Sequence, residues 1–341
     1  MQRASSTLTE RHTGLAPGTR GRLMRARNTE IFAARLGEES LDTCADAALV
    51  GELQGPLYMT VDGFAVQPLE FPGGDIGSLA VHGTINDLAV AGALPRYLTL
   101  SVILEEGIEV ELLERIVASL ARAAKTAGVS VVAGDTKVVP RGHGGGIYLS
   151  VSGVGVKDPR LELGMQHISA GDRILVSGHV GDHGTAVLLA REEFGLSGEI
   201  TSDCASVLAL VQSVSGIEGI HFLRDPTRGG LATVAHEVAL ATGLRIRLEE
   251  SAIPVHESVQ SLCEILGYDP LYLACEGRVV AFVSAAAAES VLHNWQQQPS
   301  GEAAAIIGSV ERGSAGVLLQ TPLGGLRVLE ELEDDPLPRI C

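Results

Sequence analysis

The sequence predicts a mixed α/β (α+β) protein with two domains of similar style and a short tail. A chain of 341 residues is long enough for about two domains of ordinary size. In both halves, short apolar segments of strand length alternate with longer segments of helix length. A proline within a charge cluster at 156–160 separates the halves. We therefore divide the chain into an N-terminal extension and loop, an N-terminal domain, a C-terminal domain and a tail, at 1–25, 26–158, 159–333 and 334–341.

The first half begins with a helix-like pattern over 31–36. An amphipathic helix over 109–127 is followed directly by Gly128, the residue type that most often ends a helix. The segment 134–137 comes directly after the strand predicted over 129–133. The other predicted elements are a strand over 57–61 that ends at Asp62, a helix over 76–91, and strands over 97–104, 129–133 and 147–156.

The second half begins with a strand over 171–178 that enters a glycine loop. Further strands and helices alternate after it, which again favours a sheet covered by helices. These elements are predicted to be helices over 185–194, 203–214 and 231–242, and strands over 244–248, 279–283 and 304–310.

The charge balance excludes several classes of partner. The chain carries 42 acidic against 25 basic residues, a formal net charge of −17, so nucleic acid and acidic membranes would be repelled.

No apolar run approaches the roughly 20 residues that span a bilayer, and the first six residues lack the apolar core of a secretory signal, which predicts a cytoplasmic protein. Five widely spaced cysteines without a C-x-x-C pair argue against a disulfide framework or a structural zinc site.

The last residue is a cysteine, Cys341, and it follows two prolines, Pro336 and Pro338, which favour extended backbone. An acidic run over 330–335 precedes them and indicates an exit from the folded body. One interpretation is a frayed terminus. The other is a mobile arm that presents a thiol to another molecule, and the remaining motifs favour the arm.

Four aspartates lie beside glycine or small residues at predicted strand ends or turns. Taken singly, each is explained by helix capping or by a local turn. Together, in an acidic chain rich in glycine, they predict a shared site for a divalent cation and a polyphosphate, because carboxylates that gather without a cation repel one another. The four are Asp46, Asp62, Asp87 and Asp225.

The segment after the third predicted strand carries polar side chains of its own. Asp135 and Thr136 are suited to bind a nucleotide or a phosphate. Lys137 is suited to place a positive charge beside that phosphate. No Walker A motif occurs here, and an ordinary exposed turn explains these residues equally well.

Two glycine loops open predicted helices, whose N-termini attract anions. They are 181–184, which contains Asp182, and 225–230, which contains Arg228. Glu276 lies among apolar residues just before a strand. Such surroundings raise the pKa of a carboxyl group and favour a role in proton transfer, although a turn cap is the simpler explanation.

These motifs together resemble those of a known family. The terminal Pro-Arg-Ile-Cys is the most specific, and the resemblance runs from about residue 15 to the last residue. The chain resembles the HypE family of hydrogenase maturation factors, which shares its aspartate and glycine motifs with the wider PurM-like (aminoimidazole-ribonucleotide synthetase) superfamily. The matching segments are 60–62, 71–77, 83–87, 95–98, 103–107, 134–137, 181–184, 225–230 and 338–341.

The resemblance implies a two-domain PurM-like fold whose first domain contributes strands to a β-barrel in a homodimer. It implies that ATP with Mg²⁺ binds between the domains. The metal carboxylates would be Asp46, Asp62, Asp87 and Asp225. The residues that help to hold the nucleotide would be Asn86, Asp135, Thr136, Asp182 and Arg228.

The resemblance also implies a reaction at the terminal thiol. The carbamoyltransferase HypF would supply a carbamoyl group on Cys341, and ATP-dependent dehydration would turn this thiocarbamate into a thiocyanate. The cyano group would pass to the iron of the HypC–HypD complex, as a ligand for [NiFe]-hydrogenase. Glu276 would take the proton and Lys137 would supply charge near the phosphate or carbamoyl oxygen, or the two roles would be exchanged.

The sequence departs from the family pattern at 15–22, where Pro17 replaces a histidine and Arg20 a glycine, so no site role is carried onto that loop. Two alternatives remain open. One is another ATP-dependent PurM-like enzyme, such as a selenophosphate synthetase or a thiamine-phosphate kinase. The other is a non-catalytic carrier of the Cys341 thiol, which the metal-type aspartates make less favourable.

Overall fold

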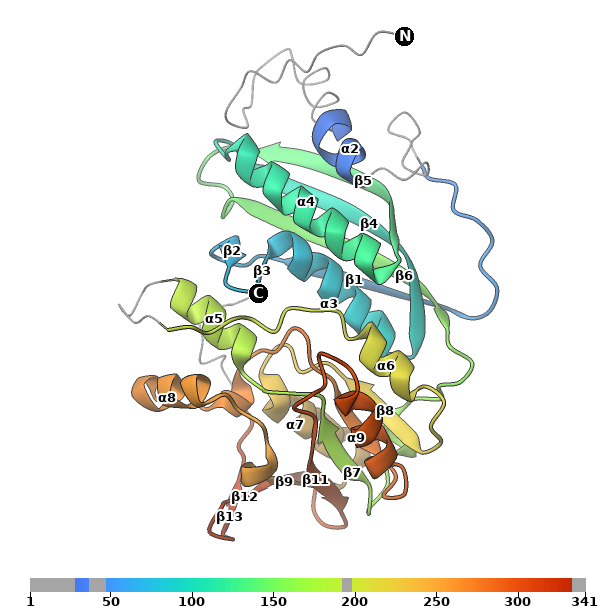
Figure 1. Ribbon diagram of the computed structural model, residues 1–341, viewed down its shortest axis with the longest axis vertical. Helices are drawn as coiled ribbons and strands as arrows, with labels where there is room; N and C mark the ends of the chain where they lie inside the picture. Colours follow the sequence, from blue (N-terminus) through green and yellow to red (C-terminus); the bar gives the residue numbers. More distant parts are fainter. Residues whose placement is uncertain (1–27, 37–46, 192–197, 333–341) are drawn as a thin grey trace.

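The computed structural model of the protein describes residues 28–36, 47–191 and 198–332. Two domains follow one another along the chain, and each has a sheet with helices packed on it, as the sequence predicts (Figure 1). The predictions for the extension, the tail, Asp46 and Cys341 concern residues outside those that the structure describes.

The N-terminal domain is built on a four-stranded sheet of order β1-β6-β4-β5, in which β4 and β5 are parallel and the other neighbours antiparallel. Helices α3 and α4 cover one face of this sheet (Figure 1). The elements are a π-helical turn (Asn28–Ala33), α2 (Ala34–Leu36), β1 (Leu57–Phe64), β2 (Glu70–Phe71), β3 (Gly74–Asp75), α3 (Ile76–Val90), β4 (Ala93–Glu105), α4 (Val110–Ala127), β5 (Ser130–Val139) and β6 (Ile147–Lys157).

Local sequence explains where the two helices begin and end. Asp75 caps α3, because its carboxylate accepts hydrogen bonds from the amides of Gly77 and Ser78, and the Ser78 hydroxyl in turn accepts one from the Asp75 amide. Gly128 ends α4 at a φ of 69°, in the left-handed region that glycine adopts without strain, as predicted.

The C-terminal domain contains a seven-stranded sheet of order β13-β12-β9-β11-β7-β10-β8. Both faces of its centre are buried, because alternate residues of β10 pack into separate cores, one with α7 and one with α6 and α9. The elements are β7 (Arg173–Val176), α5 (Asp182–Ala190), α6 (Leu208–Val214), β8 (Ile220–Arg224), α7 (Gly230–Thr242), β9 (Arg245–Glu249), α8 (Glu257–Leu266), β10 (Val280–Val283), α9 (Ala288–Gln296), β11 (Ala305–Glu311), β12 (Gly316–Gln320) and β13 (Leu326–Val328), with short 3-10 turns at Met165–His167, Glu250–Ala252 and Pro270–Tyr272.

Strand pairing extends two strands beyond their predicted ends. β1 continues through Asp62 to Phe64, and β5 continues through the segment 134–137 to Val139. The segment 134–137 therefore lies within a strand, and the alternative of an ordinary exposed turn is wrong. The physical reason is the length of β4, which offers backbone partners along the whole segment, for example Ile103 opposite Lys137.

Contacts between the domains shift one predicted helix. The helix expected over 203–214 begins only at Leu208, because the preceding backbone bonds across the domain boundary. Across the boundary, the amide of Val207 donates to Asn86 Oδ1 and the Ala205 carbonyl accepts from Asn86 Nδ2, while within the C-terminal domain the amide of Ala205 donates to the Glu276 carbonyl. The helix expected over 185–194 begins earlier, at Asp182, after Gly181.

Sequence reasoning missed five elements of the C-terminal domain, namely β8, β12, β13, α8 and α9. They span between 3 and 10 residues, which leaves too few periods for a clear apolar pattern. Among the described residues, no helix has both the length and the apolar character needed to cross a membrane.

The single tryptophan tests the packing of the C-terminal core. Trp295 of α9 is fully buried, and its Nε1 donates a hydrogen bond to the Leu210 carbonyl of α6 at 3.2 Å. We expect Trp295→Ala to lower the free energy of unfolding by about 3–5 kcal/mol, because it leaves a large cavity. Urea denaturation followed by far-UV circular dichroism measures this. Leu240→Ala is the control, since Leu240 is 80% exposed and should change stability by less than about 0.5 kcal/mol. Equal effects of the two substitutions would contradict the packing argument.

Candidate functional site

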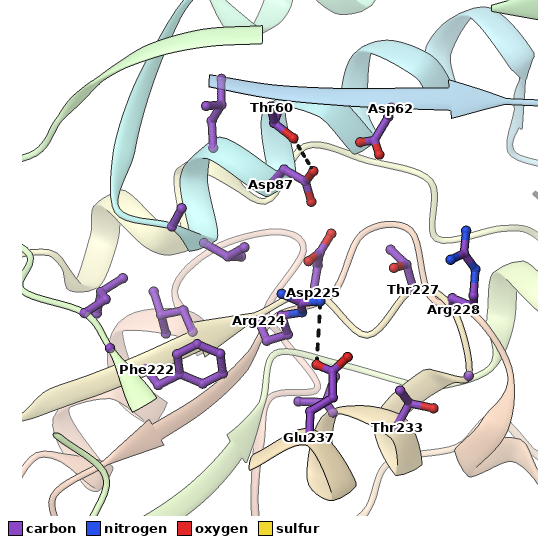
Figure 2. A pocket seen from close by; sticks show the side chains of 18 of the residues that line it. Thr60, Asp62, Asp87, Phe222, Arg224, Asp225, Thr227, Arg228, Thr233 and Glu237 are labelled. Carbon is purple, nitrogen blue, oxygen red and sulfur yellow. Dashed lines mark hydrogen bonds and ion pairs between the residues drawn. The ribbon is translucent and has the colours of Figure 1, made fainter. Parts of the chain in front are cut away.

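A cavity of about 860 Å³ lies between the two domains. Figure 2 shows Asp62 and Asp87 on its N-terminal side and Asp225, Thr227 and Arg228 on its C-terminal side. Three of the four aspartates predicted to share a site therefore line one cavity, together with one of the residues predicted to hold a nucleotide.

Strand alternation places the first carboxylate. Thr60 and Asp62 are two residues apart on β1 and so share the face on which α3 packs, whereas Met59 and Val61 point to the opposite face and are exposed. The Thr60 hydroxyl donates a hydrogen bond to Asp87 Oδ2 on α3 at 2.8 Å. β1 and the last turn of α3 thus bring two carboxylates to the same wall.

The opposite wall comes from the turn between β8 and α7. Asp225 follows β8 directly and is buried, and Arg228 lies in the turn just before Gly229. Gly229 precedes α7 at a φ of 71°, a conformation that an L side chain rarely adopts. The Pro226 carbonyl accepts a hydrogen bond from the Cys275 amide at 3.0 Å, which ties this turn to the segment that carries Glu276.

Burial and the charge of Asp87 disfavour the ionisation of Asp62 and Asp225. Burial, and then the charge of Asp87, raise the pKa of Asp62 to about 6, although Arg228 opposes the shift. Burial, and then the charge of Asp87, raise the pKa of Asp225 to about 7. A cation placed between them would favour the charged form of both groups.

The donor set fits a cation that arrives with a nucleotide. Within the described ranges, no three histidine, cysteine or carboxylate side chains converge closely enough to hold a metal ion by themselves. Mg²⁺ does not require such a cage, because it keeps several waters and is held by one or two carboxylates together with substrate phosphates. Opposed carboxylates with raised pKa values suit that mode of binding.

The structure gives Asn86 a set of contacts between the domains. Its Nδ2 donates to the carbonyls of Ala205 at 3.0 Å and Glu276 at 3.1 Å, and its Oδ1 accepts from the Val207 amide at 2.8 Å. The side chain is buried and joins α3 to two segments of the C-terminal domain. Its predicted role in holding a nucleotide stays a prediction.

Asp182 lies at the start of α5, outside the residues that line the cavity. Its buried carboxylate contacts His256 Nδ1 at 2.8 Å and Arg278 Nη2 at 3.4 Å. The His256 ring stacks on the ring of His179, with centroids 3.6 Å apart. The predicted contact of Asp182 with a nucleotide also stays a prediction.

Two other predicted residues lie on the opposite face of the N-terminal sheet. Asp135 and Lys137 pair in register with Ser101 and Ile103, whose side chains are exposed on the face away from α3 and α4. Lys137 Nζ lies 3.5 Å from Asp135 Oδ2, and both side chains are largely exposed. Thr136 lies between them on β5 and is half-buried. Within one subunit, Asp135 and Lys137 therefore do not face the cavity.

Glu276 is buried and lies beside α3, next to the cavity but not among the residues that line it. Its Oε2 lies 4.0 Å from the position that a Cβ on Gly83 would occupy, one helical turn before Asp87. The predicted proton-transfer residue is thus adjacent to the carboxylate site.

Sequence reasoning missed several residues that line the cavity. Thr60 was detectable, because strand alternation from Asp62 places it on the same face. Glu331 and Leu332 also line the cavity, where the described chain ends, and the Tyr272 hydroxyl donates to the Glu330 carbonyl at 2.6 Å. No sequence signal indicated that the chain returns to the site before its last nine residues.

The two halves of the chain match two domain models that belong to one group of proteins. Residues 44–157 match the N-terminal domain model of AIR synthase related proteins, and residues 169–319 match the C-terminal domain model. Carbamoyl dehydratase HypE of Azotobacter vinelandii is 47% identical over 326 residues, which cover 95% of this chain and 96% of that protein. The chain belongs to the HypE family. The two-domain PurM-like fold expected from the sequence is therefore confirmed.

Solved structures of HypE proteins are similar to at least nine tenths of the chain. A HypE in complex with ATP has a TM-score of 0.89 and 43% identity, and the match covers 94% of this chain and 97% of that one. HypE in a HypE–HypF complex has a TM-score of 0.79 and 44% identity, with coverage of 90% and 100%.

Proposed function

We propose that the protein is an ATP-dependent carbamoyl dehydratase, which converts an S-carbamoyl group on Cys341 into a thiocyanate for the iron of [NiFe]-hydrogenase. The observation that carries this proposal is one cavity that gathers Asp62, Asp87, Asp225 and Arg228 from two domains and is also lined by Leu332, the last described residue. Membership of the HypE family supports it.

The length of the tail supports access of the thiol to this cavity. Leu332 lines the cavity, and nine residues follow it, from 333 to 341. Nine extended residues span at most about 30 Å, which is enough to bring Cys341 from the rim into a cavity between two domains. A thiol on such an arm can be loaded elsewhere and then presented here.

The reaction that fits these groups has two stages. The carbamoyl oxygen attacks the γ-phosphorus of ATP and ADP leaves, which turns a poor leaving group into a phosphate ester. Both N–H protons then leave the nitrogen, the C–O bond breaks, and phosphate departs with the oxygen as the nitrile forms. Glu276 takes a proton from the nitrogen, and Arg228 and Lys137 supply positive charge to the phosphoryl group.

The carboxylates Asp62, Asp87 and Asp225, with Asp46, would hold Mg²⁺. The ion would neutralise charge on the ATP phosphates when bound. Asn86, Asp135, Thr136 and Asp182 are proposed to help position the nucleotide.

We further propose that the protein works as a homodimer and with two partners. The outer face of the N-terminal sheet exposes four large apolar side chains that a second copy would cover, Leu57, Met59, Val61 and Ile103. Asp135 and Lys137 lie on the same face, so a second copy would bring them toward the partner's cavity. HypF would load the carbamoyl group, in line with the complex that a related HypE forms with HypF, and a HypC–HypD complex would receive the cyano group.

Intact-mass spectrometry tests the activity. After incubation with HypF, carbamoyl phosphate and ATP, we expect the protein to gain one carbamoyl group, and with Mg²⁺ and ATP alone then to lose one water. Cys341→Ser should bind ATP normally and gain nothing. ATP hydrolysis on a free small-molecule acceptor, with Cys341 unmodified, would instead favour a kinase or a selenophosphate synthetase.

A further inference from the structure

The backbone of Glu276 is held by side chains from distant parts of the chain. Asp203 accepts hydrogen bonds from the Glu276 amide at 3.1 Å and from the Gly277 amide at 3.2 Å, one on each carboxylate oxygen. The Glu276 carbonyl accepts from Asn86 Nδ2 at 3.1 Å. Both peptide groups that flank the Glu276 side chain are therefore fixed.

The Asp203 carboxylate is itself fixed. Its side chain is fully buried, and Arg278 Nε lies 3.3 Å from Oδ2. Arg278 is held in turn by the carbonyls of His179 at 2.9 Å and Ser300 at 3.2 Å, and by Asp182. A buried charge with a full set of donors is rigid, because any displacement leaves it unpaired in a medium of low dielectric constant.

The segments 203–207 and 275–277 also approach each other closely. A Cβ on Gly277 would lie 1.9 Å from the Asp203 carbonyl oxygen, so only glycine fits beside this residue. The loop at 203–207 therefore lies directly against the 275–277 segment, and it stays non-helical for these contacts although its sequence predicts a helix.

We propose that Asp203 is a positioning residue for the dehydration, which holds Glu276 at the orientation needed to take a proton from the carbamoyl nitrogen. This inference rests on the proposed role of Glu276. Asp203 lies outside the lining of the cavity and reaches Glu276 through the two amides whose hydrogen bonds it accepts. Loss of its second acceptor would let the Glu276 backbone move, and small displacements of a catalytic group slow a reaction strongly.

The test compares Asp203→Asn, Glu276→Gln and the double variant in single-turnover dehydration of the carbamoylated protein. The asparagine offers one acceptor oxygen where two amides donate. We expect Asp203→Asn to slow dehydration about 10-fold or more, with the Kd for ATP changed less than about 3-fold. The double variant should be no slower than Glu276→Gln alone, because both substitutions disable the same group.

Asp172→Asn is the matched control for loss of a buried carboxylate. Asp172 accepts from the Ser169 amide at 2.8 Å and contacts His221 Nδ1 at 2.7 Å, and neither Asp172 nor His221 lines the cavity. It should lower the melting temperature without slowing dehydration. The role of Asp203 would be overturned if the double variant were slowed by the product of the two single fold-reductions in rate. It would also be overturned if Asp172→Asn slowed dehydration as much as Asp203→Asn does. A normal rate for Glu276→Gln would instead overturn the proposed role of Glu276.

Discussion

Asp225→Asn is expected to abolish the dehydration while making the free protein more stable at neutral and alkaline pH. The buried Asp225 has a pKa near 7, against 3.8 for an ordinary aspartate, so the folded protein binds more protons than the unfolded chain between these values. Its contribution to stability therefore falls as pH rises through that range, and the full cost is present above pH 7. Asparagine removes this cost, and we therefore expect the free energy of unfolding to rise by on the order of 2 kcal/mol at pH 8. A difference of one pKa unit corresponds to about 1.4 kcal/mol, and relaxation of the folded protein relieves part of the cost.

The measurement is thermal unfolding of both proteins at pH 5 and pH 8, with single-turnover dehydration at the higher pH. The stability gain should be larger at pH 8, and the rate should fall at least about 100-fold, because a carboxylate that holds the metal–nucleotide complex is lost. Asp172→Asn should show the reverse pattern of lower stability and retained turnover. A loss of stability in Asp225→Asn that is equal at both pH values would show that its charge carries no cost in the folded protein.

Mixed dimers of Lys137→Ala and Asp62→Asn subunits are expected to recover activity that neither variant has alone. Lys137 lies on the outer face of the sheet and Asp62 on the inner face, so we expect each active site to combine Asp62 of one copy with Lys137 of the other. A mixed dimer then contains one site with both residues intact and one site with neither. The purified mixed dimer should therefore have about half of the wild-type activity.

The two variants carry different affinity tags and are produced together, so that the mixed dimer is purified by both tags. The control is the same experiment with Asp225→Asn and Asp62→Asn. These two residues line the same cavity of one subunit, so each site of that mixed dimer lacks one of them and no activity should return. Absence of recovery in the first mixture, with a dimer present by size-exclusion chromatography and light scattering, would place Lys137 in the site of its own subunit or outside catalysis.

The sequence was sufficient for the two-domain fold, the helices α3, α4 and α7, and the expectation that Asp62, Asp87 and Asp225 would meet. Local signals carry this information, since Gly128 ends a helix and the apolar period of α4 marks its buried face. They also carried the family resemblance, which the comparisons bear out.

Tertiary structure alone decided the ends of several elements and the surroundings of the site. The segment 134–137 is a strand because β4 pairs with it, and the loop at 203–207 is not a helix because Asn86 and Glu276 take its backbone hydrogen bonds. Backbone bonds made to distant partners outweigh local propensity, since a buried polar group must be paired wherever the fold places it. The same long-range pairing holds Glu276 beside the carboxylates, so the sequence by itself determined which groups are proposed to do the chemistry, and only the packing of two domains decided which of them face one cavity.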